Sequence, residues 1–187
     1  MKAQLNIEKV LEARKIQSEL EYERALIAEG KLRVLCKDNS RLKPLRKQLR
    51  GLIEKYETKN WTDESVDAIK IKESDLAELI AEKERQFIFQ RKGIIKDNLK
   101  KFRLTQQDLM ILLGHKSKTY MSELMNGISP FTLNDLIVIN RLLKVDLSYL
   151  IPTTISQKQR VKIRKSIQTI GTTRIKLSAE DFDLVEA

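Results

Sequence analysis

The chain has 187 residues, of which 41% are hydrophobic and 33% charged, so it can bury a core of moderate size. Its formal net charge of +10 favours a polyanionic partner. A single cysteine excludes an internal disulfide, and no apolar run reaches the ~18 residues of a membrane helix or serves as a secretory signal. These features predict a cytoplasmic protein.

Scarce turn residues, six Gly and three Pro, predict an all-α fold. Residues 5–35 carry apolar side chains at helical spacing, which predicts one long helix that ends near Gly30 or continues to about Lys37. A turn at 38–40 and a second helix at about 41–58 follow, with Pro44 in its first turn. The apolar stripes of the two helices are expected to pack as a hairpin or to form a dimer seam.

The next helix is expected over 75–91, capped by Ser74 and stopped by Arg91-Lys92-Gly93. Trp61, just before it, is interpreted as a packing anchor. The apolar side of the helix is formed by Leu76, Leu79, Ile80, Phe87 and Ile88.

From residue 94 onward, five short helices are predicted in about 60 residues. Thr105, with Asp108 three residues later, is expected to cap a helix that ends at Gly114. Ser117 is expected to cap a helix over about 118–126, and Thr132 precedes a helix over 133–144. The residues expected to face inward are Leu109, Leu112, Leu113, Met121, Leu124, Met125, Leu133, Leu136, Ile137 and Leu143.

The C-terminal part is strongly basic. Residues 156–178 hold seven Lys or Arg and no acid, and Ile163, Ile167 and Ile170 follow helical spacing. A basic amphipathic helix is expected, although the alternation in VKIRKSI also permits a strand. Residues 172–187 are expected to be an extended tail with an acidic end. The chain therefore divides into a helical extension (1–92), a compact domain (93–155) and a basic helix with its tail (156–187).

Residues 104–127 contain two short amphipathic runs joined by Gly-His-Lys-Ser, which could be an ordinary helical hairpin or a helix-turn-helix. A helix-turn-helix requires polar groups at the start of both helices and apolar residues between them. Thr105, Gln106 and Gln107 open the first helix and could bind phosphate through backbone N–H groups and amides. Outward positions of the second run are Lys116, Ser117, Lys118, Thr119, Tyr120 and Ser122.

The register L-T-Q-Q-x-L, L-G, S-E-L-x-N-G and P-x-T-L-x-D-L resembles the Cro/C1-type (XRE-like) helix-turn-helix family. It is also similar to the HigA-type antitoxins, and the clear similarity covers about 91–152. The resemblance implies a homodimer that binds double-stranded DNA at an operator, usually an inverted repeat in its own promoter. It also implies a possible small basic toxin protein that cleaves messenger RNA and is neutralised by the chain.

The same resemblance implies roles for individual residues. Gln106 and Gln107 would contact phosphate, residues 116–120 would face the groove, and Asn126 would close the second helix near the backbone. Lys118 and Tyr120 are the candidates for base readout. Lys162 and Arg164 in the basic helix would track phosphate.

No catalytic, metal or cofactor site is expected. His115 and Cys36 are each unique and lie far apart in the sequence, and the glycines are isolated. His115 is expected to satisfy the bend or to touch phosphate. Two alternatives remain, a stand-alone repressor without a toxin and a protein-interaction module that uses residues 1–58 or the tail. RNA binding is disfavoured because aromatic residues make up only 5%.

Overall fold

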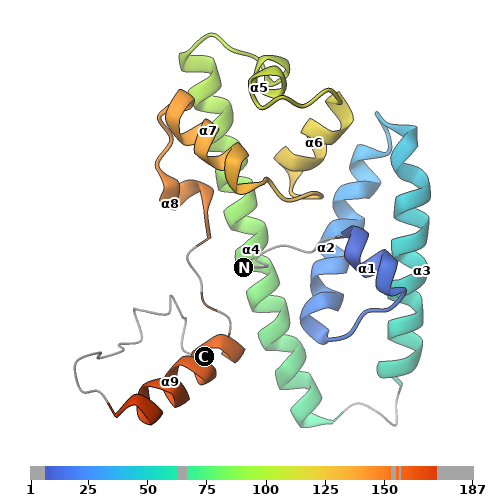
Figure 1. Ribbon diagram of the computed structural model, residues 1–187. Coiled ribbons are helices and arrows are strands. Elements are labelled where there is room, and N and C mark those ends of the chain that lie inside the picture. The colour runs from blue at the N-terminus through green and yellow to red at the C-terminus, as the bar shows by residue number, and fades with distance from the viewer. Residues whose placement is uncertain (1–6, 63–66, 153–154, 156, 172–187) are drawn as a thin grey trace. The chain divides into compact units, whose positions relative to one another are not determined.

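The computed structural model describes residues 7–62, 67–152, 155 and 157–171, and all regular structure in these ranges is helical (Figure 1). The chain separates into two compact units, residues 1–150 and 151–187. In these same ranges, no helix combines the length and the apolarity needed to cross a bilayer.

The single helix predicted over 5–35 is in fact two helices. α1 (Ile7–Ala13) ends at Arg14, which has φ of 53°, and α2 (Glu19–Leu35) begins after Ser18. The Ser18 hydroxyl accepts a hydrogen bond from the Glu21 N–H at 3.2 Å, and this cap starts a new helix. Of the two predicted ends, the one at about Lys37 is close, since α2 passes through Gly30 and ends at Leu35. One glycine inside a packed helix costs only about 1 kcal/mol.

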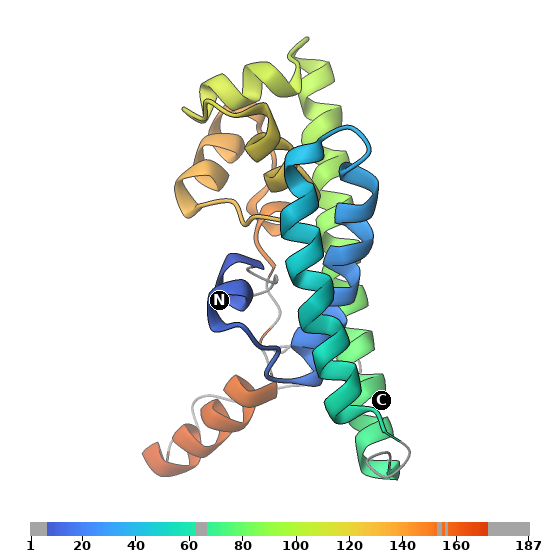
Figure 2. The same cartoon turned by 90° about the vertical axis from the view of Figure 1, so that its right-hand side faces the viewer.

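The predicted helical hairpin is confirmed. α2 and α3 (Lys43–Asn60) lie side by side in opposite directions, joined through the 3-10 turn η1 (Ser40–Leu42), and Pro44 lies in the first turn of α3 (Figures 1 and 2). At the end of the hairpin away from η1, the rings of Tyr22 and Tyr56 stack 5.1 Å apart. The core of this part is formed by Ile7, Val10, Ile16, Ala25, Ala28, Leu32, Cys36, Leu42, Leu49, Leu52, Ile53 and Ile128.

The helix predicted over 75–91 is wrong at both ends. α4 (Ala68–Lys101) starts at Asp67, whose carboxylate accepts the Lys70 N–H at 2.7 Å, and it continues through Gly93 without a break. The position between residues 92 and 93, expected to separate two domains, therefore falls inside one helix.

The face that α4 turns towards α2 differs in part from the prediction, although Ile88 is buried as predicted. Leu76 and Leu79 are exposed, whereas Ala77 and Ala81 are buried. α2 likewise contributes buried alanines, and small side chains on both helices let the two backbones approach closely. The leucine stripe therefore lies beside the contact and the alanine stripe forms it.

The upper half of α4 carries four short helices. These are α5 (Gln106–Leu112), α6 (Lys118–Asn126), α7 (Leu133–Leu143) and α8 (Leu147–Leu150), and each packs against α4 (Figure 1). The predicted caps Thr105 and Ser117 are confirmed, whereas the predicted cap Ser74 lies inside α4. Thr105 and Thr132 form capping boxes with Asp108 and Asp135, and the Ser117 hydroxyl caps α6.

The core around α4 agrees only in part with the predicted inward faces. Buried as predicted are Leu109, Met121, Leu124, Met125, Leu136 and Leu143. Leu112, Leu133 and Ile137 are exposed, and their expected places are taken by Met110 in α5 and by Ile139 in α7. Such short helices contact their neighbours along one narrow stripe, and each residue rotates that stripe by about 100°, so a shift of two residues turns a side chain from core to solvent.

The second unit contains α9 (Gln157–Ile170), which is a helix and not the strand that VKIRKSI permitted. Ile163 and Ile167 are half-buried, while Ile170 is exposed. The predicted cap Ser156 and the predicted extended tail at 172–187 lie outside the described residues.

The contrast between Leu124 and Leu112 can be measured. Leu124 has 0% of its surface exposed, so Leu124→Ala is expected to lower the free energy of unfolding by about 2–5 kcal/mol. Leu112 is 45% exposed, and Leu112→Ala is expected to cost about 1 kcal/mol or less. Denaturant unfolding followed by circular dichroism checks both variants, and equal losses would contradict the assignment of the α6 core face.

Candidate nucleic-acid interface

The start of α6 is exposed and positively charged. Lys116, Ser117 and Lys118 are all exposed, and the Ser117 hydroxyl accepts the Tyr120 N–H at 3.1 Å. Gly114 has φ of 76°, a conformation that glycine adopts without strain and that turns the chain from α5 into this segment. The first turn of α6 holds no acidic residue, so the positive end of its helix dipole adds to the two lysines.

The next two candidate residues are half-buried. The Thr119 hydroxyl accepts a hydrogen bond from the side-chain amide of Asn39 at 2.9 Å, a contact with the end of the N-terminal hairpin. The ring of Tyr120 meets the ring of His115 edge-on, with 5.2 Å between their centroids. Of the two residues chosen for base readout, Lys118 is thus the exposed one, and Tyr120 packs against the turn.

His115 connects this turn to α7. Its Nε2 lies 3.1 Å from Oδ1 of Asp135, and the Asp135 carboxylate is almost fully buried. The other oxygen of Asp135 accepts the Thr132 N–H at 2.9 Å, so the carboxylate that caps α7 also lies against the α5–α6 turn. His115 was expected either to satisfy the bend between the two helices or to touch phosphate, and its contact with Asp135 corresponds to the first role.

Ser122 and Asn126 lie on a side of α6 that is half-buried against α4. The ammonium of Lys92 donates to Oδ1 of Asn126 at 2.6 Å. The amide of Asn126 donates in turn to the Ser122 carbonyl oxygen at 2.7 Å. These polar groups are therefore already engaged within the protein, and the accessible part of α6 is its start.

The start of α5 differs from the start of α6 in charge. Gln107 is exposed and Gln106 is half-buried, but the carboxylate of Asp108 caps the same helix end. The backbone N–H and the hydroxyl of Thr105 both donate to this carboxylate, and these bonds lower the pKa of Asp108. It therefore stays anionic at neutral pH, and its charge opposes a phosphate at this helix end.

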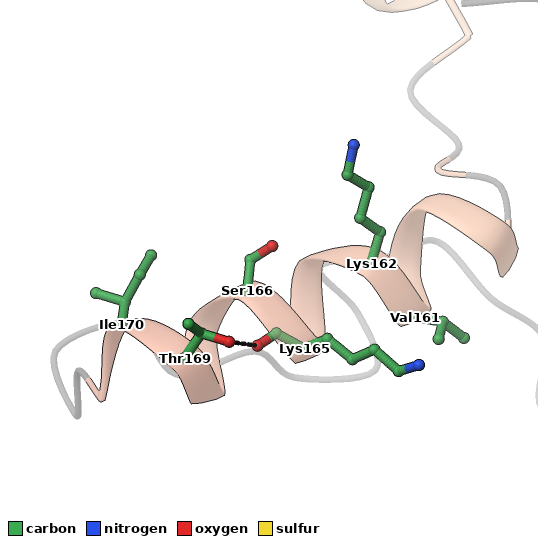
Figure 3. Close-up of a pocket in the computed structure, with 6 residues that line it drawn as sticks. All are labelled: Val161, Lys162, Lys165, Ser166, Thr169 and Ile170. Carbon is green, nitrogen blue, oxygen red and sulfur yellow. Dashed lines mark hydrogen bonds between the residues drawn. The ribbon is translucent and has the colours of Figure 1, made fainter.

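The remaining two predicted residues belong to the second unit. Lys162 and Arg164 are exposed on α9, and α9 contains no acidic residue. Figure 3 shows the side chains of Lys162 and Lys165 pointing in different directions, and the Thr169 hydroxyl donating to the Lys165 carbonyl oxygen, a bond of 3.0 Å. α9 thus presents positive charge on more than one side.

A second group of cations was not foreseen from the sequence. Lys31 of α2 lies in a groove that is also lined by Arg85 of α4 and by Gly127. Burial, with repulsion from Arg85, Arg91 and Lys92, lowers the pKa of Lys31 to about 8. The signal was present as basic residues in both helices, Lys31 in α2 and Arg85, Arg91 and Lys92 in α4, but only the packing of α2 on α4 brings them together. Arg24 also lines the groove, and it forms an ion pair with Glu84 at 2.5 Å.

Arg91 was expected to end a helix, and it is instead buried in the middle of one. Its guanidinium lies 5.2 Å from the ring centroid of Phe131 and 5.7 Å from that of Phe87. Nη1 donates to the Leu150 carbonyl oxygen at 3.4 Å, which ties α8 to α4. Burial lowers the pKa of Arg91 to about 10, so the side chain keeps its charge at neutral pH.

Comparison with family models, with curated proteins and with solved structures returned no match for this chain. Among the described residues, no three His, Cys, Asp or Glu side chains are grouped so that they could hold a metal ion.

The buried charge of Lys31 gives a prediction with a defined pH range. Lys31→Met is expected to raise the free energy of unfolding at pH 7 by about 1–2 kcal/mol, because it removes a cation that is desolvated and repelled by its neighbours. The gain is limited because solvent screens the exposed part of the side chain. The pKa of Lys31 is about 8 in the folded chain, and its ordinary value is 10.5. The wild-type chain should therefore gain stability as the pH rises from about 8 to 10.5. The advantage of the variant should therefore disappear by about pH 10.5.

Denaturant unfolding at a series of pH values measures this effect. Lys47→Met is the control, since Lys47 is exposed on α3. A Lys31→Met variant that matches wild type at pH 7 would show that the amine is not desolvated.

Proposed function

We propose that the chain is a sequence-specific DNA-binding transcriptional regulator in which α5, the turn at 113–117 and α6 act as a helix-turn-helix. The observation that carries the proposal is the exposed start of α6. It combines Lys116, Ser117 and Lys118 with a helix end free of carboxylates. Buried Met121, Leu124 and Met125 fix the opposite face of the same helix in the core.

The shape of this helix end suits the major groove of a duplex. A helix with its side chains is about 10–12 Å across, close to the groove width of about 12 Å. Because the sides of α6 contact α4, α5 and the hairpin, the helix would enter by its N-terminal end, where side chains reach base edges. Lysine can donate to the O6 and N7 atoms of guanine, which makes Lys118 the residue for base readout.

The charge distribution favours nucleic acid over an acidic protein surface. The chain has a net charge of +10, and α9 adds a helix without acidic residues to the exposed lysines of α6. Contacts between such cations and phosphates release counterions, so binding should weaken steeply with salt.

A homodimer on an inverted repeat, and a toxin neutralised by the chain, follow from the sequence resemblance to HigA-type antitoxins. Both stay predictions. Co-purification of a small basic protein with the chain tests the toxin, and binding to fragments of its own promoter tests autoregulation. Tight operator binding without a co-purifying protein favours the stand-alone repressor.

Changing Lys118 to Ala tests base readout. On a promoter fragment selected by the wild-type chain, Lys118→Ala is expected to lose about 1–3 kcal/mol of discrimination at one base position, because a bidentate contact is removed. Fluorescence anisotropy with the selected duplex and its single-base variants measures this loss. Lys55→Ala, an exposed lysine of α3, is the control. Unchanged affinities for specific and random duplexes would exclude the role.

Changing the basic helix tests a different kind of contact. Lys162→Ala and Arg164→Ala are each expected to weaken binding to specific and random duplexes alike, because phosphates carry no sequence information. Each change should reduce the slope of log affinity against log salt by about 0.9. A slope equal to that of wild type would show that α9 does not contact the backbone of the DNA.

A further inference from the structure

The connection between α2 and α3 touches the start of α6. This connection, residues 37–43, is called the hairpin tip. One side chain organises it, because Oδ1 of Asn39 accepts the Arg41 N–H at 3.1 Å and thereby begins η1. The amide of the same Asn39 donates to the Thr119 hydroxyl at 2.9 Å. The conformation of the hairpin tip is thus coupled directly to the first turn of α6.

A second contact holds the other end of α6 on the same hairpin. Gly127, with φ of 70°, ends the helix and turns the chain, and Ile128 follows with 3% of its surface exposed. Ile128 belongs to the core cluster of the hairpin, together with Leu32 and Leu49. Since α6 is attached to the hairpin near both of its ends, the position of the hairpin tip relative to the start of α6 is fixed.

The hairpin tip carries positive charge beside the two lysines of α6. Lys37, Arg41 and Lys43 are exposed, with Asp38 as the one acidic residue of the segment. Leu42, between them, is buried and anchors the segment in the core. Within the described part of the chain, the three tip cations make no ion pair with a carboxylate. They are available to an anion from outside.

We propose that the hairpin tip is a second DNA-contacting element, which binds the phosphates that flank the groove entered by α6. This inference rests on the proposed function. Asn39 is hydrogen-bonded to Thr119. Lys37, Arg41 and Lys43 are two to four residues from Asn39 in the sequence, so their side chains can reach about one side-chain length beyond the edge of α6. The groove is about 12 Å wide, which brings the phosphates of one bordering strand within that reach. An acidic tip in this place would repel the phosphates of a duplex, whereas a cationic tip attracts them.

The test removes the tip charges without touching the core. In the triple variant Lys37→Ala, Arg41→Ala, Lys43→Ala, affinity for a duplex that the wild-type chain binds is expected to fall about 10- to 100-fold. The fall should be equal for specific and random sequences, and the salt slope should drop by about 2–3, since each lost phosphate contact contributes about 0.9. Anisotropy titrations at several salt concentrations give both quantities, with circular dichroism to verify folding.

A charge-matched control separates position from net charge. The triple variant Lys55→Ala, Lys59→Ala, Lys72→Ala removes the same charge from exposed residues near the opposite end of the hairpin. Lys55 and Lys59 lie about 18–24 Å along α3 from Lys43, well beyond the screening length of about 8–10 Å. Its affinity is expected to stay within about twofold of wild type.

Asn39→Ser tests the attachment itself. Serine can still cap η1, but its side chain is too short to reach Thr119, so affinity should fall while every charge is kept.

The outcomes distinguish the two proposals. A wild-type chain that binds no duplex overturns the proposed function and this inference with it. A tip variant that binds with the affinity of wild type overturns only the inference. A tip variant that binds more tightly also overturns it, because the tip would then obstruct the duplex. Equal losses in the tip variant and the control also overturn it, because net charge alone would then explain them.

Discussion

The structure of the first unit depends on the continuity of α4. This helix of 34 residues packs the hairpin against its first part and the four short helices against its second. Buried alanines form the first contact, and Ile95 and Leu99 form the second. Gly93 lies between the two contacts, and a chain break there would leave two groups of helices without a common support. The cost of glycine inside the helix, about 1 kcal/mol, is small beside the packing on either side.

Positive charge is concentrated where the helices meet, and this has an electrostatic cost. Lys31, Arg91 and Lys92 lie close enough for their charges to interact, and burial lowers the pKa of all three. Arg91 is compensated in part by two aromatic rings and one carbonyl oxygen, while its buried Nη2 has no hydrogen-bond partner among the described residues, and Lys92 is compensated by Asn126. Both compensating contacts reach elements far along the chain, so the charged groups also join α8 and α6 to α4. The net charge of +10 is therefore partly built into the interior of the fold, and only the remainder is available to a partner.

The arrangement around α6 links this architecture to the proposed function. α4 and the hairpin hold the helix along its length, and the start of the helix is the part left accessible. Two neighbouring helices begin with an aspartate at the third position, which satisfies their N–H groups internally. α6 has no such aspartate, so its positive end can interact with an external anion. The N-terminal hairpin, which the sequence suggested as a dimerisation or partner-binding extension, contacts this end through Asn39.

The sequence by itself determined the local features of this protein. The caps at Thr105 and Ser117, the place of Pro44 and the turn at 38–40 each depend on atoms within about four residues, which a linear sequence shows. The expected cap at Ser74 failed because α4 begins earlier, at Asp67. The exposed lysines at 116 and 118 were recognised for the same reason.

Only the tertiary structure decided which stripe of each helix is buried, whether α4 continues through Gly93, and which polar groups meet. Asn39 and Thr119 are 80 residues apart, and Arg91 and Leu150 are 59 apart. Such pairs form only after the helices have packed, and a difference of one or two residues in helix rotation decides them. The sequence pattern cannot specify that rotation, because several stripes of α4, α5 and α7 are apolar enough to be the core face.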